Sequence, residues 1–357
     1  MKNKKILVAV LCITCLVFGL CGCGKSDETT TNTTATNNKK TYNIGICVGA
    51  NNEYYNQILA GFTTAVNDNF KDSNAVMTSL VADENNSSDM ICDQFVQNKN
   101  QLMFTIGENA MLSAHSRTKD IPIVSSAIMD FQRALNLPDD KDWDGTTKTN
   151  ITGVSSAPNM SDVLSMMIEA TPELSSVGIL FCPENADSIY QNKLLEKYLD
   201  QAGIPWKEYA FYSPSISDDS AREIVKFACS ESSVLYIPAE SALMDKMGLI
   251  KSVAMSSNIP TIGGDEYIGE YTLCSMYHDP FDQGYAAGEM AYDILESGKK
   301  PQSMSIAECS TTAEQKLYTS DYADALGRTF PKSFRERTEF LTTYVLGSKT
   351  TRNNVEK

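Results

Sequence analysis

Residues 43–66 read NIGICVGANNEYYNQILAGFTTAV, and this stretch decides the fold. Its first six residues, Asn43 to Val48, form the short apolar run that is typical of a buried strand. Apolar residues then recur at i, i+1, i+4, i+7 and i+8 from Ile58, which predicts an amphipathic helix. A buried strand followed at once by such a helix is the first half of a βαβ unit, so the stretch predicts a parallel sheet.

The same alternation of strand and helix continues along the chain. The other candidate strands are Ala75 to Leu80, Leu102 to Thr105, Ile121 to Ser125, Ile151 to Val154, Val177 to Phe181, Val234 to Ile237, Pro260 to Ile262 and Tyr271 to Met276. A second clear helical pattern runs from Val163 to Ala170. About 300 residues of this pattern exceed the needs of one doubly wound sheet. We therefore expect an α/β fold with two lobes.

The N-terminus has the layout of a secretory signal peptide. Three lysines precede the apolar run Ile6 to Leu20, which is too short to span a bilayer comfortably as a helix. The run ends in Leu20-Cys21-Gly22-Cys23, which resembles a bacterial lipobox. We expect residues 1–22 to be removed and Cys23 to carry a diacylglyceryl anchor, which would hold the protein outside the cytoplasm on the bacterial cell membrane. The alternatives are an uncleaved anchor and ordinary secretory cleavage.

Composition restricts the partners of the mature chain. The 357 residues carry a net charge of −15, and removal of the three signal-peptide lysines takes it to −18. This acidity argues against nucleic acid and anionic lipid headgroups, because binding to either depends on Lys and Arg. Residues 23–41 lack aromatic and large aliphatic side chains after the lipobox, so we expect a disordered tether.

The cysteines and histidines give no metal or catalytic motif. Six cysteines remain in the folded part, and they lie far apart: Cys47, Cys92, Cys182, Cys229, Cys274 and Cys309. Their spacing matches no metal site, and two histidines exclude an all-histidine one. Several of these cysteines sit in apolar runs, which favours buried thiols over any one disulfide, although export permits pairing. We predict no metal, no cofactor and no catalytic residue.

The polar segment 132–149 looks like a surface excursion before the chain crosses to its second lobe. Its Trp143 is either a ligand platform or part of an insertion packed on the outside. We predict a first lobe of residues 42–150 and 277–305, a second of residues 151–276 and 306–345, and a tail of residues 346–357.

Short motifs in order along the chain resemble the ABC-transporter substrate-binding family that contains tryptophan- and tyrosine-type amino-acid binders. They are Lys119-Asp-Ile-Pro-Ile-Val124, Asn150-Ile-Thr-Gly-Val154, Ser176-Val-Gly-Ile-Leu180, Tyr236-Ile-Pro238, Ile259-Pro-Thr-Ile-Gly-Gly264, Gly284-Tyr-Ala-Ala-Gly288, Ala291-Tyr-Asp-Ile-Leu295 and Ala323-Asp-Ala-Leu-Gly327. The resemblance implies a type I periplasmic-binding-protein architecture with two Rossmann-like lobes, three crossovers and a ligand enclosed between them.

The same resemblance implies the partners. We expect a monomer that delivers a small ligand to an ABC permease driven by a separate ATPase. A lipoprotein that senses the ligand for a receptor is the alternative, followed by an exported enzyme. No GxSxG, HExxH or GxxxxGK[ST] motif supports the enzyme. The first loop reads GANNEYY in place of the family's His-Pro pair, so the resemblance leaves the ligand open.

The loops after the strands indicate the charge of the ligand. In open parallel sheets ligands sit beyond the carboxyl ends of the strands. Those loops contain ten acids and no Lys or Arg: Glu53, Glu108, Asp130, Glu184, Asp187, Glu240, Asp265, Glu266, Asp279 and Asp282. About half of these acids are expected to cap helices or to face helix dipoles. The absence of cations argues against a phosphorylated ligand and favours one with an ammonium group.

We predict a zwitterionic amino acid, with aromatic ones included, or another small amine. One or two of the acids would pair the ammonium, while hydroxyls and helix N-termini would hold a carboxylate. Aromatic rings such as Tyr54 and Tyr277 would form walls. The predicted ligand-binding residues are Asn51, Asn52, Tyr54, Glu108, Asn109, Asp130, Ser155, Ser156, Asn185, Asp187, Glu240, Asp265, Glu266, Tyr277 and Asp279.

Overall fold

The computed structural model describes residues 39–138, 143–212, 215–308 and 315–342. They belong to one folded unit, Lys39–Lys357. The signal peptide, Cys23 and nearly all of the tether lie outside these described residues. Within them, every helix is too short or too polar to cross a membrane.

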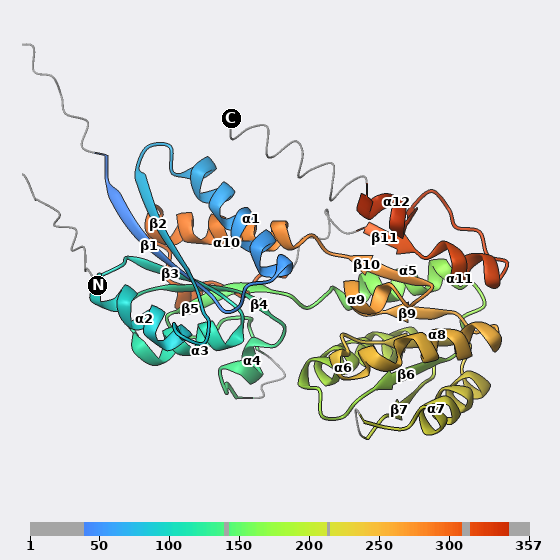
Figure 1. Ribbon diagram of the computed structural model, residues 1–357. Helices are drawn as coiled ribbons and strands as arrows, with labels where there is room; N and C mark the ends of the chain where they lie inside the picture. The colour runs from blue at the N-terminus through green and yellow to red at the C-terminus, as the bar shows by residue number, and fades with distance from the viewer. Residues whose placement is uncertain (1–38, 139–142, 213–214, 309–314, 343–357) are drawn as a thin grey trace, which may run out of the picture. The chain divides into compact units, whose positions relative to one another are not determined.

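Five parallel strands form the first sheet, in the order β2-β1-β3-β4-β5 (Figure 1). They are β1 (Thr41–Val48), β2 (Asn74–Val81), β3 (Leu102–Ile106), β4 (Ile123–Ile128) and β5 (Ile151–Ser155). The apolar strands β1 and β3 lie inside the sheet, and β2 forms a partly exposed edge. Each of the five was predicted from its apolar run.

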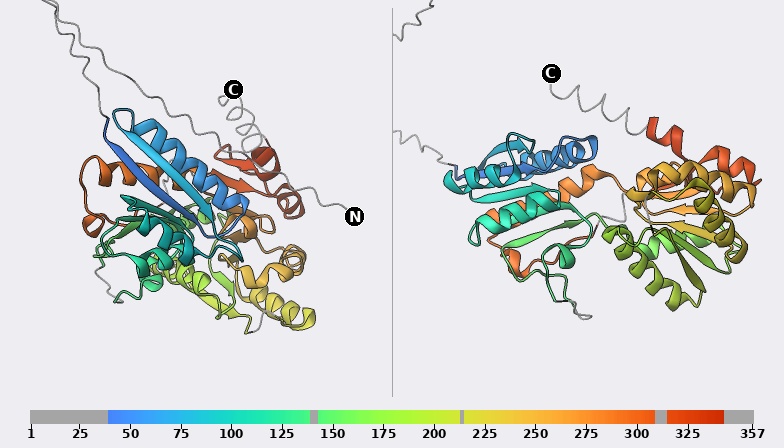
Figure 2. Two further views of the ribbon diagram at one scale, coloured as in Figure 1. Left: turned by 60° about the vertical axis from the view of Figure 1, so that its left-hand side comes forward. Right: turned by 60° about the horizontal axis from the view of Figure 1, so that its bottom comes forward.

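Two pairs of helices cover the faces of this sheet. Helices α1 (Glu53–Asn69) and α10 (Pro280–Leu295) lie side by side on one face, and α2 (Ser88–Gln97) and α3 (Glu108–Arg117) lie on the other (Figures 1 and 2). Each face holds its own cluster of buried apolar side chains. Although α10 is far from α1 in the sequence, the two helices complete the same core.

Seven strands form the second sheet, in the order β12-β11-β10-β9-β8-β6-β7. They are β6 (Val177–Phe181), β7 (Trp206–Ala210), β8 (Val234–Ile237), β9 (Thr261–Gly263), β10 (Cys274–Tyr277), β11 (Gln315–Tyr318) and β12 (Phe334–Glu336). All neighbours are parallel except β10 and β11. The sequence prediction missed β7, β11 and β12, which are short, largely polar strands at or near the sheet edges.

One large cluster of buried apolar side chains surrounds the second sheet.

The remaining helices of the described residues are α4 (Phe131–Ala134), α5 (Met160–Ala170), α6 (Ala186–Ala202), α7 (Asp218–Glu231), η1 (Ser241–Lys246), α8 (Met247–Ser256), α9 (Glu266–Gly269), η2 (Pro301–Ser303), α11 (Ser320–Ala325) and α12 (Arg337–Phe340).

The chain passes between the two sheets three times: from β5 to α5, from β10 to α10, and between Ala307 and β11. Ala307 still belongs to the first sheet, because its N–H donates to Gly153 O at 2.8 Å and its carbonyl accepts from Ser155 N at 2.8 Å. Strand β5 also lies in the first sheet, although the predicted lobe boundary precedes it at residue 151. The lobe boundaries themselves stay a prediction.

The structure separates the alternatives for Trp143 and for the cysteines. Trp143 packs against the α2/α3 core, and its Nε1–H donates to Thr146 O at 2.8 Å, as expected of a packed insertion. The five described cysteines are buried free thiols, and Cys309 lies outside the described residues.

Candidate functional site

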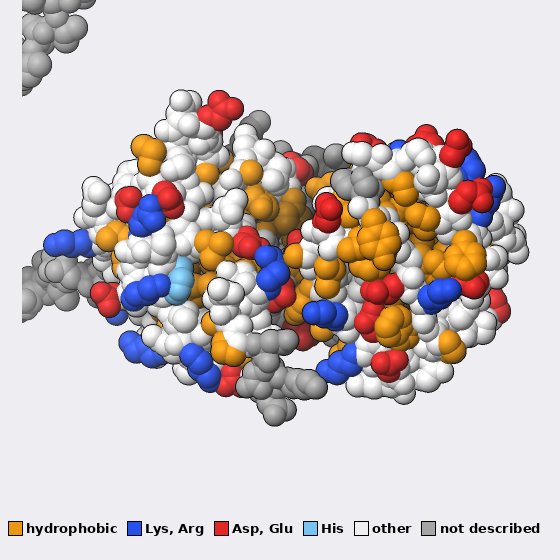
Figure 3. All heavy atoms as spheres, turned by 90° about the horizontal axis from the view of Figure 1, so that it is seen from below, with side chains coloured by type: hydrophobic (Ala, Val, Ile, Leu, Met, Phe, Trp, Pro, Cys, Tyr) orange, Lys and Arg blue, Asp and Glu red, His pale blue; other side chains and the backbone are white. Residues whose placement is uncertain are grey.

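A pocket of about 600 Å³ lies at the carboxyl ends of the strands. Its wall takes residues from α1 and from the segments that follow β4, β5, β6, β8, β9 and β10, as parallel topology predicts. The volume falls within the range of small-molecule sites, about 300–1,000 Å³. In the space-filling view, hydrophobic side chains and charges of both signs border the hollow in the middle of the face (Figure 3). Within the described part of the chain, the residues that line the pocket include no Lys or Arg.

Seven of the predicted binding residues line this pocket, and eight do not. The seven are Tyr54, Ser156, Asn185, Asp187, Asp265, Glu266 and Tyr277. Those outside the lining are Asn51, Asn52, Glu108, Asn109, Asp130, Ser155, Glu240 and Asp279. Their roles in ligand binding stay predictions.

Several of the predicted side chains cap helices. Asn52 accepts from Tyr55 N at 2.8 Å at the start of α1, Asp130 caps α4, and Asp279 caps α10. Asn185 and Asp265 cap α6 and α9 and still line the pocket. Each loop after a parallel strand leads into the N-terminus of a helix. The same types of polar side chain therefore serve as helix caps and as ligand-binding groups.

Two further predicted residues lie just behind the pocket wall. Glu240 is fully buried, and its carboxylate accepts from Cys182 N at 2.8 Å and Asn185 Nδ2 at 2.9 Å. Glu240 thereby holds the pocket residue Asn185 in place. Ser155 Oγ donates to Met129 O at 2.9 Å and accepts from Ala157 N at 3.1 Å, which fixes the loop that carries Ser156.

Four acids line the pocket, and two of them are paired with arginines that were not predicted at the site. Asp187 lies 3.7 Å from Arg133, and Glu266 Oε1 lies 3.0 Å from Arg337. Arg133 lies one residue beyond the predicted loop after β4, residues 127–132. Arg337 lies in the C-terminal segment, where no predicted strand pointed to the site.

Burial raises the pKa of three of these carboxyl groups. The pKa of Asp265 rises to about 6, because removal from water outweighs the N–H donors of the α9 cap. The pKa values of Asp187 and Glu266 are also raised by burial, against the lowering effect of Arg133 and Arg337 respectively. Asp265 therefore takes up a proton more readily than an exposed aspartate.

Aromatic and amide groups form much of the rest of the polar wall, beside Ser156, Ser241 and His278. The hydroxyl of Tyr54 lies 3.0 Å from the amide nitrogen of the buried Gln283, which also lines the pocket. The ring of Tyr277 meets that of Phe340 edge to face at 5.3 Å between centroids, and the next residue, Leu341, lines the pocket. The lining glutamines Gln57, Gln191 and Gln283, and Leu341 from the C-terminal segment, lie in no sequence pattern that marks a binding site.

Comparison with known proteins supports the architecture. The chain is 26% identical, over 304 residues, to a tyrosine-binding protein of Clostridioides difficile (strain R20291). The alignment covers 83% of this chain and 85% of the relative. The ligand-free, open structure of a substrate-binding protein with adhesive properties from Clostridium difficile superposes with a TM-score of 0.71 at 23% identity, over 83% of this chain and 99% of that one.

A second solved structure is the ABC domain from Streptococcus pneumonia in complex with L-Trp, with a TM-score of 0.59 at 23% identity over 82% of this chain and 97% of that one. The chain thus has the α/β fold of the type I periplasmic-binding proteins. The family model described as ABC transporter substrate binding protein matches residues 43–315. This chain belongs to that family of substrate-binding proteins.

Proposed function

We propose that the protein is an extracytoplasmic solute-binding lipoprotein that delivers a small zwitterionic amino acid or related amine to an ABC importer. The observation that carries the proposal is the pocket lining, which combines four acids with tyrosine rings and, among the described residues, contains no Lys or Arg. An anionic ligand normally requires a cation in such a site, whereas an ammonium group requires an acid.

Asp265 is the proposed partner of the ligand's ammonium group. Arg133 and Arg337 already pair with Asp187 and Glu266, so these two acids are partly neutralised. Asp265 lines the pocket, and its carboxylate accepts backbone hydrogen bonds from the first turn of α9, including one from Ile268 N at 2.7 Å. A ligand carboxylate would meet Ser156 and the backbone N–H groups at helix starts.

An aromatic side chain suits the remaining wall. Tyr54, Tyr267 and Tyr277 line the pocket, and rings in such positions stack on a ligand ring or lie over its cation. The relatives include a tyrosine-binding protein and a domain solved with L-Trp, which supports an aromatic amino acid here.

The proposed mechanism is transport without covalent chemistry. The ligand enters between the two sheets, and the chain bends where it passes from one sheet to the other. The closed form then docks on a permease whose separate ATPase supplies the energy. The diacylglyceryl group on Cys23 keeps the protein at the membrane.

A thermal-shift panel tests the proposed ligand class. We expect aromatic amino acids or their amines, at about one hundred times Kd, to raise the unfolding temperature of the exported domain by about 4 °C or more. Sugars, nucleosides and phosphorylated compounds should leave it unchanged. Stabilisation by sugars or anions alone would overturn the ammonium assignment, and consumption of a ligand would overturn the transport function.

The pH dependence of binding tests the role of Asp265. Protonation removes the negative charge, so the proton competes with the ammonium group, and affinity is highest above the pKa of about 6. We expect affinity for the bound amine to fall about tenfold between about pH 7 and about pH 5, measured by titration calorimetry.

The matched variant is Asp265→Asn, because asparagine still caps α9 while it carries no charge. It should bind the amine more weakly at neutral pH, with affinity that is much less dependent on pH. An equally steep pH profile in this variant would assign the titration to another group, such as Asp187 or Glu266, and would contradict the proposed pairing.

A further inference from the structure

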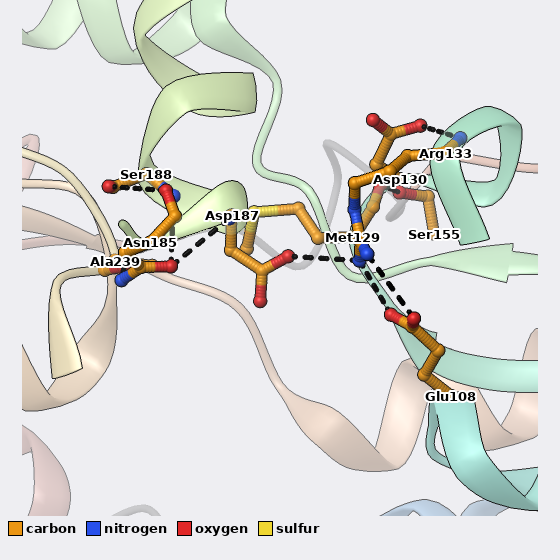
Figure 4. Close-up of polar contacts among 9 residues, drawn as sticks. All are labelled: Glu108, Met129, Asp130, Arg133, Ser155, Asn185, Asp187, Ser188 and Ala239. Atoms are coloured by element: carbon orange, nitrogen blue, oxygen red, sulfur yellow. Dashed lines mark hydrogen bonds and ion pairs between the residues drawn. The ribbon is translucent and has the colours of Figure 1, made fainter. Parts of the chain in front are cut away.

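Arg133 joins the two sides of the pocket. It lies in the short helix α4, where Asp130 accepts from its backbone N–H at 3.0 Å. Its guanidinium donates to Glu108 through both terminal nitrogens, at 2.6 and 3.3 Å, and lies 3.7 Å from Asp187 (Figure 4). Glu108 begins α3 on the first sheet, and Asp187 lies in the first turn of α6 beside the second sheet.

The geometry makes Glu108 the anchor of the guanidinium. A bidentate pair between arginine and a carboxylate fixes the orientation of the guanidinium plane as well as its position. The longer contact to Asp187 is then an electrostatic one, made from a group that Glu108 already holds. The pKa of Arg133 is raised, chiefly by its hydrogen bonds to Glu108, so it stays charged.

The charge at this rim depends on the arginine. With Arg133, the three side chains carry one net negative charge, and without it they carry two, one of them on the pocket residue Asp187. Arg133 itself is not among the pocket-lining residues, so it acts on the ligand by offsetting the charge of Asp187. An Asp187 without its arginine would repel a carboxylate on the ligand and would attract the ligand's ammonium group more strongly.

We propose that Arg133 sets the charge selectivity of the pocket, favouring an amine that carries a carboxylate over the same amine without one. Arg133 is thus a positioning residue, and this role rests on the proposed function of the pocket. The predicted effect is a change in the ratio of two affinities. A general loss of structure would weaken the binding of both ligands alike and would leave that ratio unchanged.

L-Tyrosine and tyramine are the probes, because they share the ring and the ammonium group and differ by the carboxylate. In Arg133→Gln the ratio of the Kd of tyrosine to that of tyramine should rise about fivefold or more, as expected for loss of one charge near the ligand in a partly screened site. Arg133→Lys, which keeps the charge, should stay within about twofold of the wild type. The change in ratio should shrink as salt is raised from about 0.05 to about 0.5 M.

Arg117→Gln is the matched control. Arg117 ends helix α3, which Glu108 begins, and it pairs with Asp89 and Asp93 on the protein surface. Its replacement by glutamine removes the same unit of charge as Arg133→Gln. It should leave the ratio unchanged, and Asp187→Asn combined with Arg133→Gln should restore the wild-type ratio. Unfolding temperatures without ligand report whether each variant is folded.

The outcomes separate the two proposals. If the wild type binds at least one probe and Arg133→Gln weakens or strengthens both equally, the selectivity assignment is wrong while the ligand class stands. An equal response to Arg117→Gln would also overturn it, since any lost charge would then have the same effect. If the wild type binds neither probe, the proposed class of aromatic amines fails, and the role of Arg133 fails with it.

Discussion

Gly284→Ala should lower the free energy of unfolding by about 3 kcal/mol, the largest effect that we expect from one added methyl group. A Cβ at Gly284 would lie 1.8 Å from the backbone oxygen of Ile58, and one at Gly61 would lie 1.9 Å from the backbone oxygen of Phe281. These glycines allow α10 and α1 to approach closely over the first sheet. The obstacle is backbone, so the two helices themselves must move apart.

This substitution should also affect binding. Helix α10 begins with Pro280, which lines the pocket together with Gln283, while Glu53 and Tyr54 of α1 line it from the neighbouring helix. Urea unfolding measures the stability, and calorimetry measures ligand affinity below the unfolding transition. We expect both to decrease.

Gly248→Ala is the control for this prediction. Gly248 lies near the start of α8, where a Cβ would meet nothing within 4 Å. Because alanine is favoured over glycine in helices by about 1 kcal/mol, this variant should be as stable as the wild type or more stable. Equal stabilities for the two alanine variants would contradict the close packing of α1 on α10.

Arg337→Ala should destabilise the protein by about 3 kcal/mol and abolish most ligand binding. The arginine side chain is only 6% exposed, and it donates to Ser275 and, at 3.0 Å, to Glu266. Its loss leaves the carboxylate of Glu266 without its cation. The other oxygen of Glu266 is buried and has no hydrogen-bond partner among the described residues, so that charge would be poorly compensated.

Three variants test the pairing of Arg337 with Glu266. Arg337→Lys should recover part of the stability, and Glu266→Gln added to Arg337→Ala should recover part as well, because it removes the unpaired charge. Arg328→Ala is the control, since Arg328 pairs with the half-exposed Glu173 and donates to Ala170 O at 3.2 Å, contacts that together should be worth about 1 to 2 kcal/mol. Losses of the same size at Arg337 and Arg328 would refute a special role for the buried pair.

The sequence predicted the elements that bury an apolar run. Strands such as β1, β3 and β6 are fully or largely buried, so their residues had to be apolar and were recognisable. Strand β7 was missed because it forms a sheet edge, where WKEYA buries only one of its five residues. Edge strands have little need of an apolar pattern, and β12 at the opposite edge and its neighbour β11 also lack one.

The candidate site was predictable only in part, as the strands were. Parallel topology requires that the loops after the strands meet at one edge of each sheet, so Asp187, Asp265 and Tyr277 could be assigned to the pocket from their positions alone. The sequence did not indicate which of the acidic side chains would point into the pocket. Glu240 and Glu266 both follow strands, yet one is buried behind the wall while the other lines it.

The sequence by itself determined the class of fold, the positions along the chain of the strands that bury an apolar run, and the acidic character of the loops, because each depends on residues close together in the chain. Only the tertiary structure decided which of those acids pair with an arginine. Arg133 reaches Asp187 from another element, and Arg337 reaches Glu266 across 71 residues of chain. The charge of a site is a sum over neighbours in space, and folding brings those neighbours from segments whose spacing in sequence carries no signal.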